Sequence, residues 1–184
     1  MKILHYTIGF PPKRTGGLTS YALDLMTEQV RMGNEVVALY PGNLSLFNKK
    51  TKIKTGKKLA GITNFQIINS LPLPLIRGIK TPFDFMTPTD EKVYKDFLNQ
   101  IKPDVIHVHT LMGLHKEFFT VSKSLGIKLV FTSHDYFGLA PVPEFYFGGK
   151  SYDEDNTNEA WNIMSSSALS TKTLRLYQIP FLNC

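Results

Sequence analysis

The sequence has few of the features that mark secreted, disulfide-bonded or membrane-spanning proteins. It contains one cysteine, Cys184 at the last position, which excludes an internal disulfide framework and a cysteine-ligated metal site. So little cysteine fits a reducing cytoplasm. No apolar run approaches the roughly 18 residues that suggest a membrane span. The alternating N-terminus, MKILHYTIGFPP, lacks the unbroken apolar region of a signal peptide. We therefore expect a cytoplasmic protein.

Apolar residues and positive charge are well represented. The chain has 184 residues, of which 42% are hydrophobic and 20% charged, as expected for one globular domain. The net charge is +6, and six lysines lie in KKTKIKTGKK, Lys49 to Lys58. This segment is either a solvated loop or a contact for an anionic membrane surface or a phosphorylated acceptor. It has no interleaved aromatic residues and no recognised motif, so we expect no nucleic-acid partner.

Apolar periodicity and chain breakers predict strands that alternate with helices. Helices are expected from Gly17 to Gly33, from a Thr87 cap with Pro88 in the first turn, and near 114–125. Residues 43–62 and 71–88 are expected to form loops, and 142–184 to hold an acidic solvated loop followed by a helical pattern. Strands are expected at residues 2–8, 35–40, 65–69, 104–109 and 127–133. This order predicts an α/β protein with a Rossmann-like parallel sheet and helices on both faces.

In such sheets ligands bind beyond the carboxyl ends of the strands. Gly16 and Gly17 follow the first strand and open a helix, where free N–H groups and the helix dipole favour an anion. Lys13 and Arg14 just upstream favour phosphate contact. The pattern matches neither of the common glycine-rich phosphate motifs, so a plain strand-to-helix turn remains the alternative.

Histidines follow two of the other strands. His107 and His109 alternate on one strand and therefore face the same side, with His109 nearer the end and better placed to touch a ligand. Local spacing supplies no third ligand, so no metal is expected. His134 and Asp135 come after the last strand. The histidine can bond a hydroxyl or phosphate oxygen or move a proton, and the aspartate can instead cap a turn.

Three segments in this order together resemble the N-terminal half of glycosyltransferase family 4, which has the GT-B fold. They are FPPKRTGGLTSYALDLMTEQVRMGNEVVALYPG, KPDVIHVHTLMGL and LVFTSHDYFGLAP. The resemblance covers residues 1 to about 141. It implies two Rossmann-like domains across a cleft, of which the first holds the acceptor and the second most of the nucleotide-sugar donor. It also implies transfer with retention of anomeric configuration, without a metal or other cofactor.

The resemblance assigns roles to individual residues. Gly16 and Gly17 match the loop whose backbone approaches the donor diphosphate, and His134 with Asp135 matches the active-site histidine and the acid after it. His109 matches the second histidine of the strand end, on the acceptor side with Lys13 and Arg14. Ala140 departs from the family, because many relatives have cysteine before the proline that is Pro141 here.

Length is the second departure, because no second Rossmann pattern follows. Residues 1–184 are therefore expected to be a truncated acceptor-side domain, inactive alone and without its nucleotide-sugar-binding domain. The expected activity transfers sugar to a saccharide or lipid-linked acceptor in cell-envelope polysaccharide synthesis, peripheral to the inner face of the membrane. The alternatives are a non-catalytic flavodoxin-like α/β ligand-binding module and a membrane-surface domain built on Lys49 to Lys58.

Overall fold

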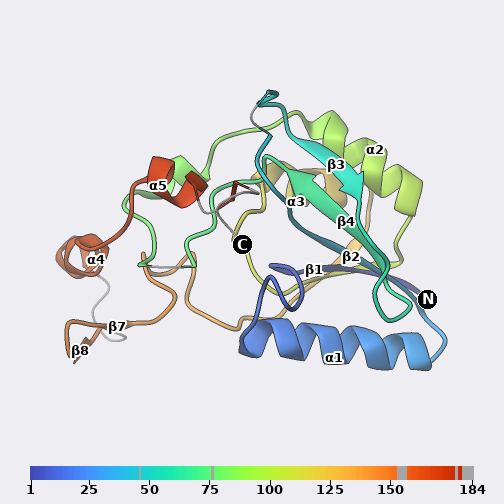
Figure 1. Cartoon of the computed structure of the whole chain (residues 1–184), viewed down its shortest axis with the longest axis horizontal. Helices are drawn as coiled ribbons and strands as arrows, with labels where there is room; N and C mark the ends of the chain where they lie inside the picture. The colour runs from blue at the N-terminus through green and yellow to red at the C-terminus, as the bar shows by residue number, and fades with distance from the viewer. Residues whose placement is uncertain (46, 76, 153–156, 177, 180–184) are drawn as a thin grey trace.

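The computed structural model describes the whole chain except residues 46, 76, 153–156, 177 and 180–184 (Figure 1). The acidic loop predicted around 153–156 and the single cysteine, Cys184, lie outside the described residues. Within the described part, no helix is both long enough and apolar enough to cross a bilayer.

A six-stranded sheet forms the centre of the fold, with the strand order β3-β4-β2-β1-β5-β6. All neighbours pair in parallel except β3, which runs antiparallel to β4. The predicted α/β fold is confirmed. The strands are β1 (Lys2–Tyr6), β2 (Glu35–Pro41), β3 (Lys52–Thr55), β4 (Thr63–Ile68), β5 (Val105–Val108) and β6 (Lys128–Phe131).

The prediction of a loop over residues 43–62 is wrong for β3. This strand lies at the edge of the sheet, and only Ile53 is partly buried against the core. Its neighbours Lys52 and Lys54 are exposed. A strand that buries one side chain leaves almost no alternating apolar pattern, so its sequence is easily taken for a lysine-rich loop.

Helices cover both faces of the sheet, as predicted. Helix α1 (Gly17–Arg31) lies on one face, and α2 (Glu91–Ile101) and α3 (Lys116–Ser124) lie on the other (Figure 1). The larger core lies on the α2 and α3 face and includes Leu4, Tyr6 and Phe118. The smaller core packs Ala22 and Met26 of α1 against β2. Burial of apolar surface on both faces holds the parallel strands together.

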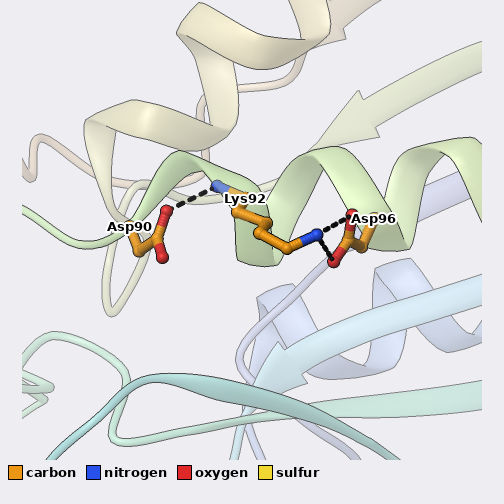
Figure 2. A network of polar contacts seen from close by, with 3 residues as sticks. All are labelled: Asp90, Lys92 and Asp96. Atoms are coloured by element: carbon orange, nitrogen blue, oxygen red, sulfur yellow. Dashed lines mark hydrogen bonds and ion pairs between the residues drawn. The ribbon is translucent and has the colours of Figure 1, made fainter.

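Helix α2 begins later than its sequence suggests. Asp90 is its N-cap, and the Asp90 Oδ1 atom accepts a hydrogen bond of 2.9 Å from the Lys92 backbone N–H. Figure 2 shows this bond and the contact, also 2.9 Å, between Lys92 Nζ and Asp96. The predicted cap at Thr87 with Pro88 in the first turn is therefore wrong. An aspartate directly before the helical residues satisfies the first-turn N–H groups, so the helix starts there.

The C-terminal part of the chain lies beyond the carboxyl ends of the parallel strands (Figure 1). It is attached through Arg175, which donates to the Ser70 carbonyl, and through the Ile79 N–H, which donates to Pro141 O at 2.7 Å. Its apolar cluster includes Met164, on the helix predicted after the acidic loop. The elements of this part are β7 (Tyr146–Phe147), β8 (Lys150–Ser151), α4 (Asn158–Ser165) and α5 (Thr171–Leu176), whereas the short helix η1 (Pro82–Phe85) precedes α2 in the chain.

The two edges of the main sheet differ in chemistry. Strand β3 presents exposed lysines, whereas Leu129, Val130 and Phe131 of β6 are 41%, 47% and 53% exposed. Among the described residues, β6 pairs with β5 alone. One edge is therefore charged and the other apolar.

Candidate functional site

The strand order reverses between β1 and β5, which is where open α/β sheets bind ligands. The loop after β1 carries Gly16 and Gly17. Strand β5 ends just before His109, and the neighbouring β6 leads to His134. The structure therefore brings the candidates from three strand ends to one edge of the sheet.

The glycine pair forms the start of α1. Gly16 is the N-cap, and its φ of 120° is a backbone conformation that residues other than glycine rarely adopt. No side chain caps the helix. A Cβ atom built on either glycine would meet no heavy atom within 4 Å, so the space in front of this backbone is open. The turn is thus conformationally dependent on Gly16, and it leaves the first-turn N–H groups of α1 approachable.

Three histidines form a hydrogen-bonded chain on the α1 face of the sheet. His5 Nδ1 lies 3.0 Å from His109 Nε2, and His109 Nδ1 lies 3.4 Å from His134 Nε2. At the inner end, His5 Nε2 lies 2.7 Å from the Gln29 Oε1 atom of α1. His107 stands outside the chain and bonds Thr132 Oγ1 at 2.8 Å.

The direction of these hydrogen bonds follows from Gln29, whose Oε1 atom can only accept. His5 therefore donates from Nε2, which makes its Nδ1 an acceptor for the N–H of His109 Nε2. His109 Nδ1 in turn accepts from His134 Nε2. With all three rings neutral, the lone pair of His134 is on Nδ1. The tautomer of His134 is therefore set by the side-chain amide of Gln29, which is three hydrogen bonds away.

Burial keeps the inner histidines neutral. The pKa of His5 falls to about 4, chiefly through loss of solvation and also through the nearby His107, although the hydrogen bond to Gln29 opposes the shift. The pKa of His109 falls to about 3 because of burial and the neighbouring histidines. Burial also lowers the pKa of His107. A charge on the inner part of the chain is therefore unfavourable at neutral pH.

His109 was expected to touch a ligand, but its side chain has no exposed surface. It reaches the surface through His134, which is partly exposed. Tyr21 of α1 packs against both, with its ring centroid 4.9 Å from that of His134 and 6.0 Å from that of His109. Because Tyr21 lies one turn from Gly17, this contact joins the glycine end of α1 to His134.

Asp135 shapes the loop that holds His134. Its Oδ1 atom accepts from the Phe137 N–H at 2.9 Å, and its carbonyl accepts from Ser133 Oγ at 2.9 Å. This is the turn-capping geometry that the sequence left open as an alternative to a catalytic role.

One group of three side chains in the described part has a spacing suited to a metal ion. The ligand atoms of His5, His107 and His109 lie within 4.8 Å of one another. His5 was missed as a third ligand because it comes from a different strand, opposite His107 in the β1–β5 register. Both nitrogens of His5 and of His109 already hold hydrogen bonds, so a metal would have to displace them.

The remaining candidates lie over the strands on the other side of β1 from β5 and β6. Lys13 and Arg14 line a cavity of about 650 Å³ over β2 and β4, together with Lys57 and Lys58. The six lysines of the 49–58 segment therefore do not form one patch. Lys49 and Lys50 line a second cavity, of about 660 Å³, and the other two lie on β3.

Sequence reasoning missed His5, Gln29 and Tyr21. The alternation of residues along β1 predicts which residues share a face of the sheet with His5. Only the pairing of β1 with β5 places His5 beside His109. Tyr21 recurs at helical spacing with Leu18, Ala22 and Leu25, which predicts an apolar helix face, whereas its ring packs against the rings of His109 and His134.

No curated protein matches the chain. The catalytic domain of starch synthase IV from Arabidopsis thaliana, solved bound to ADP and acarbose, is 15% identical, with a TM-score of 0.40. The match covers 73% of this chain and 34% of that one, so the chain spans about a third of that relative. The family model Glycosyltransferase Family 4 matches residues 15–170, well over half of the sequence. The chain therefore belongs to glycosyltransferase family 4.

Proposed function

We propose that this chain forms the acceptor-side domain of a retaining glycosyltransferase. The enzyme moves a sugar from a nucleotide-sugar donor to a saccharide or lipid-linked acceptor in cell-envelope polysaccharide synthesis. Family membership favours sugar transfer over the flavodoxin-like binding module. The observation that carries the proposal is the packing of Tyr21 on His134, because it joins the free N-terminus of α1 to a histidine whose tautomer is set.

The glycine end of α1 would stabilise the leaving group. Negative charge develops on the donor diphosphate as the acceptor hydroxyl replaces it at the anomeric carbon. N–H groups at the uncapped start of α1, from Gly17 onward, supply partial positive charge without reorganisation. Because these groups can act on the diphosphate, we propose that transfer requires no metal ion or other cofactor.

His134 would hold the reacting sugar. Its Nε2–H is committed to His109, so its Nδ1 lone pair accepts a hydrogen bond from a hydroxyl of the donor sugar or acceptor. Asp135 acts as a positioning residue, because its bond to the Phe137 N–H fixes the loop.

We further propose that the protein works in the cytoplasm, peripheral to the inner face of the membrane. The support is the exposed lysine pair of β3, Lys52 and Lys54. Each lysine near an anionic bilayer surface contributes about 1 kcal/mol to binding.

Replacing Gly17 by Ala tests the role of the glycine loop without disturbing the helix. Gly17 is helical and the added Cβ would meet open space, so folding stability should be unchanged or slightly higher. The methyl group would keep a diphosphate from the N–H groups. We expect kcat of the full-length protein to fall about 100-fold, measured as transfer from a panel of nucleotide sugars.

The matched control is Ser20→Ala, an exposed change in the same helical turn, which should leave kcat within twofold. His134→Gln should also lower kcat about 100-fold or more. Wild-type rates for both Gly17→Ala and His134→Gln would contradict the proposed site.

Replacing Gln29 by Met tests the histidine chain. The change removes the acceptor for His5 Nε2–H and so releases the tautomer of His134. We expect kcat to fall about tenfold with KM unchanged, equivalent to one hydrogen bond of about 1.4 kcal/mol. Gln29→Glu keeps an acceptor oxygen and should restore most of kcat. A Met variant with wild-type kcat, or a Glu variant no better than Met, would refute the positioning role.

A further inference from the structure

A cavity of about 650 Å³ lies on the α1 side of the sheet, away from the histidines. Its floor is formed by Tyr40 of β2 and by Asn64 and Gln66 of β4. One wall is the β1–α1 loop, and another is the loop between β3 and β4. These walls contribute four cationic side chains, Lys13, Arg14, Lys57 and Lys58, and we call this the basic cavity.

The charge of the basic cavity is not compensated by the described part of the chain. None of its described lining residues is acidic, and none of its four cations forms an ion pair with a described carboxylate. Arg14 is half-buried, and loss of solvation lowers its pKa. A desolvated cation without a counter-charge is unfavourable, and an anion in the cavity would relieve that cost.

The backbone is adapted to hold Arg14 in this position. Gly9 has φ of 125°, and a Cβ atom there would lie 3.0 Å from Arg14 Cγ. The aliphatic part of the Arg14 side chain therefore packs against the backbone of Gly9. Glycine is favoured at position 9 both by the positive φ and by the lack of space for a Cβ atom. Close packing of the Arg14 stem on Gly9 therefore helps to fix where Arg14 lines the cavity.

The floor of the basic cavity requires a hydrogen-bond donor. Asn64 is 2% exposed, and its Nδ2 atom donates to the Lys57 carbonyl at 2.7 Å. Its Oδ1 atom is buried and has no hydrogen-bond partner in the described part. Beside it, the Tyr40 hydroxyl accepts from Gln66 Nε2 at 3.1 Å, which leaves the tyrosine proton free to donate. A ligand hydroxyl would satisfy Asn64.

We propose that the basic cavity binds a phosphorylated saccharide, with the phosphate against the lysines and Arg14 and a sugar hydroxyl donating to Asn64 Oδ1. This inference rests on the proposed function, because it makes the phosphorylated saccharide the acceptor. The β1–α1 loop connects the cavity to the glycine end of α1, so one loop serves both substrates. The same chemistry is presented by a soluble sugar phosphate and by a sugar phosphate in a lipid headgroup.

Calorimetric titration of the full chain with glucose 6-phosphate, inorganic phosphate and glucose tests the site without requiring catalysis. We expect glucose 6-phosphate to bind more tightly than phosphate, and glucose to bind undetectably. Lys57→Ser/Lys58→Ser should weaken glucose 6-phosphate binding at least tenfold, because the charge-assisted hydrogen bonds from both lysines to the phosphate are lost. Arg14→Met, which keeps the stem but removes the charge, should do the same.

The matched control is Lys95→Ser/Lys123→Ser, which makes the same change of charge on α2 and α3 and should alter affinity less than twofold. Asn64→Leu should weaken glucose 6-phosphate binding but not phosphate binding. Circular dichroism of each variant shows that it is folded. Absence of glucose 6-phosphate binding, phosphate binding of equal strength, or an equal loss in the control pair would overturn the proposal.

Vesicles separate the two sources of ligand. Binding to phosphatidylinositol vesicles over phosphatidylcholine vesicles, displaced by glucose 6-phosphate, assigns the ligand to a headgroup. Glucose 6-phosphate binding without vesicle binding assigns it to a soluble saccharide, and either result supports the cavity. If transfer is absent but lysine-dependent binding persists, the proposed function fails and the cavity stands. If transfer occurs with an unchanged acceptor KM in Lys57→Ser/Lys58→Ser, the cavity proposal fails alone.

Discussion

Lowering the pH from 7.5 to 4.5 is expected to remove most of the free energy of unfolding of this chain. Three buried histidines cause the effect. The pKa falls to about 4 for His5, to about 3 for His109 and to about 4 for His115, in each case chiefly through burial. His115 lies under α2, where its Nδ1 atom bonds the Tyr94 hydroxyl at 2.8 Å.

The direction of the effect follows from proton uptake. Unfolded histidines take up a proton near pH 6.5, whereas these folded ones stay neutral until about pH 4 or below. Stability is therefore complete above pH 6.5 and is lost as the pH falls toward 4. At pH 4.5 each histidine costs about 2.5 kcal/mol. Together they cost about 7.5 kcal/mol, which lies within the 5–15 kcal/mol that is typical of the stability of a whole domain.

Urea unfolding at pH 7.5, 6.0 and 4.5, followed by circular dichroism, measures this loss. His109→Asn should be less stable than the wild type at pH 7.5, because it breaks the histidine chain, yet lose less stability on acidification, because one proton-uptake site is gone. A free energy of unfolding that is flat between pH 7.5 and 4.5 would show that these rings are not held neutral.

Replacing Gly78 by Ala is expected to destabilise the chain by about 3–5 kcal/mol. A Cβ atom on Gly78 would lie 2.0 Å from Pro141 O and 2.9 Å from Val142 Cα. Both are backbone atoms, so no side-chain rotation relieves the clash. The residue also has φ of 70°, where a side chain costs roughly 1–2 kcal/mol in strain. The segment around Pro141 would have to move away and expose its apolar cluster, which contains Ala140 and Val142.

Gly126→Ala is the matched control for this change. Gly126 has nearly the same φ, 69°, but a Cβ atom there would meet nothing within 4 Å. It should show only the conformational cost of roughly 1–2 kcal/mol. Urea midpoints for the two variants separate strain from clash. Equal midpoints would mean that the 78–141 contact does not hold the C-terminal part to the sheet.

Runs rich in apolar and β-branched residues were sufficient to predict β1, β2 and β5, because these inner strands are largely buried on both faces. They were not sufficient for β3, where Ile53 alone packs on the core. The start of α2 was misplaced because Thr87 and Asp90 both resemble caps in sequence. Only the bond from the Lys92 N–H to Asp90 distinguishes them.

The candidate site could be predicted where it depends on position along a strand. Gly16, Gly17 and His134 follow strand ends, and a parallel sheet brings such ends together. The support behind His134 depends instead on which strands are neighbours and how α1 is rotated. His5 and Gln29 meet across the sheet–helix interface, and no local spacing encodes that contact. The same holds for Lys13 and Lys57, which share a cavity although α1, β2 and β3 separate them in sequence.

The two edge strands of the sheet, β3 and β6, differ in how readily they would pair with another strand. An incoming strand meets the cationic side chains of Lys52 and Lys54 at β3, which disfavour pairing by repulsion and by hydration. At β6 it meets Leu129, Val130 and Phe131, whose exposed surfaces reward coverage. Although Lys128 of β6 is also exposed, the side chains at this edge disfavour pairing less than those of β3 do.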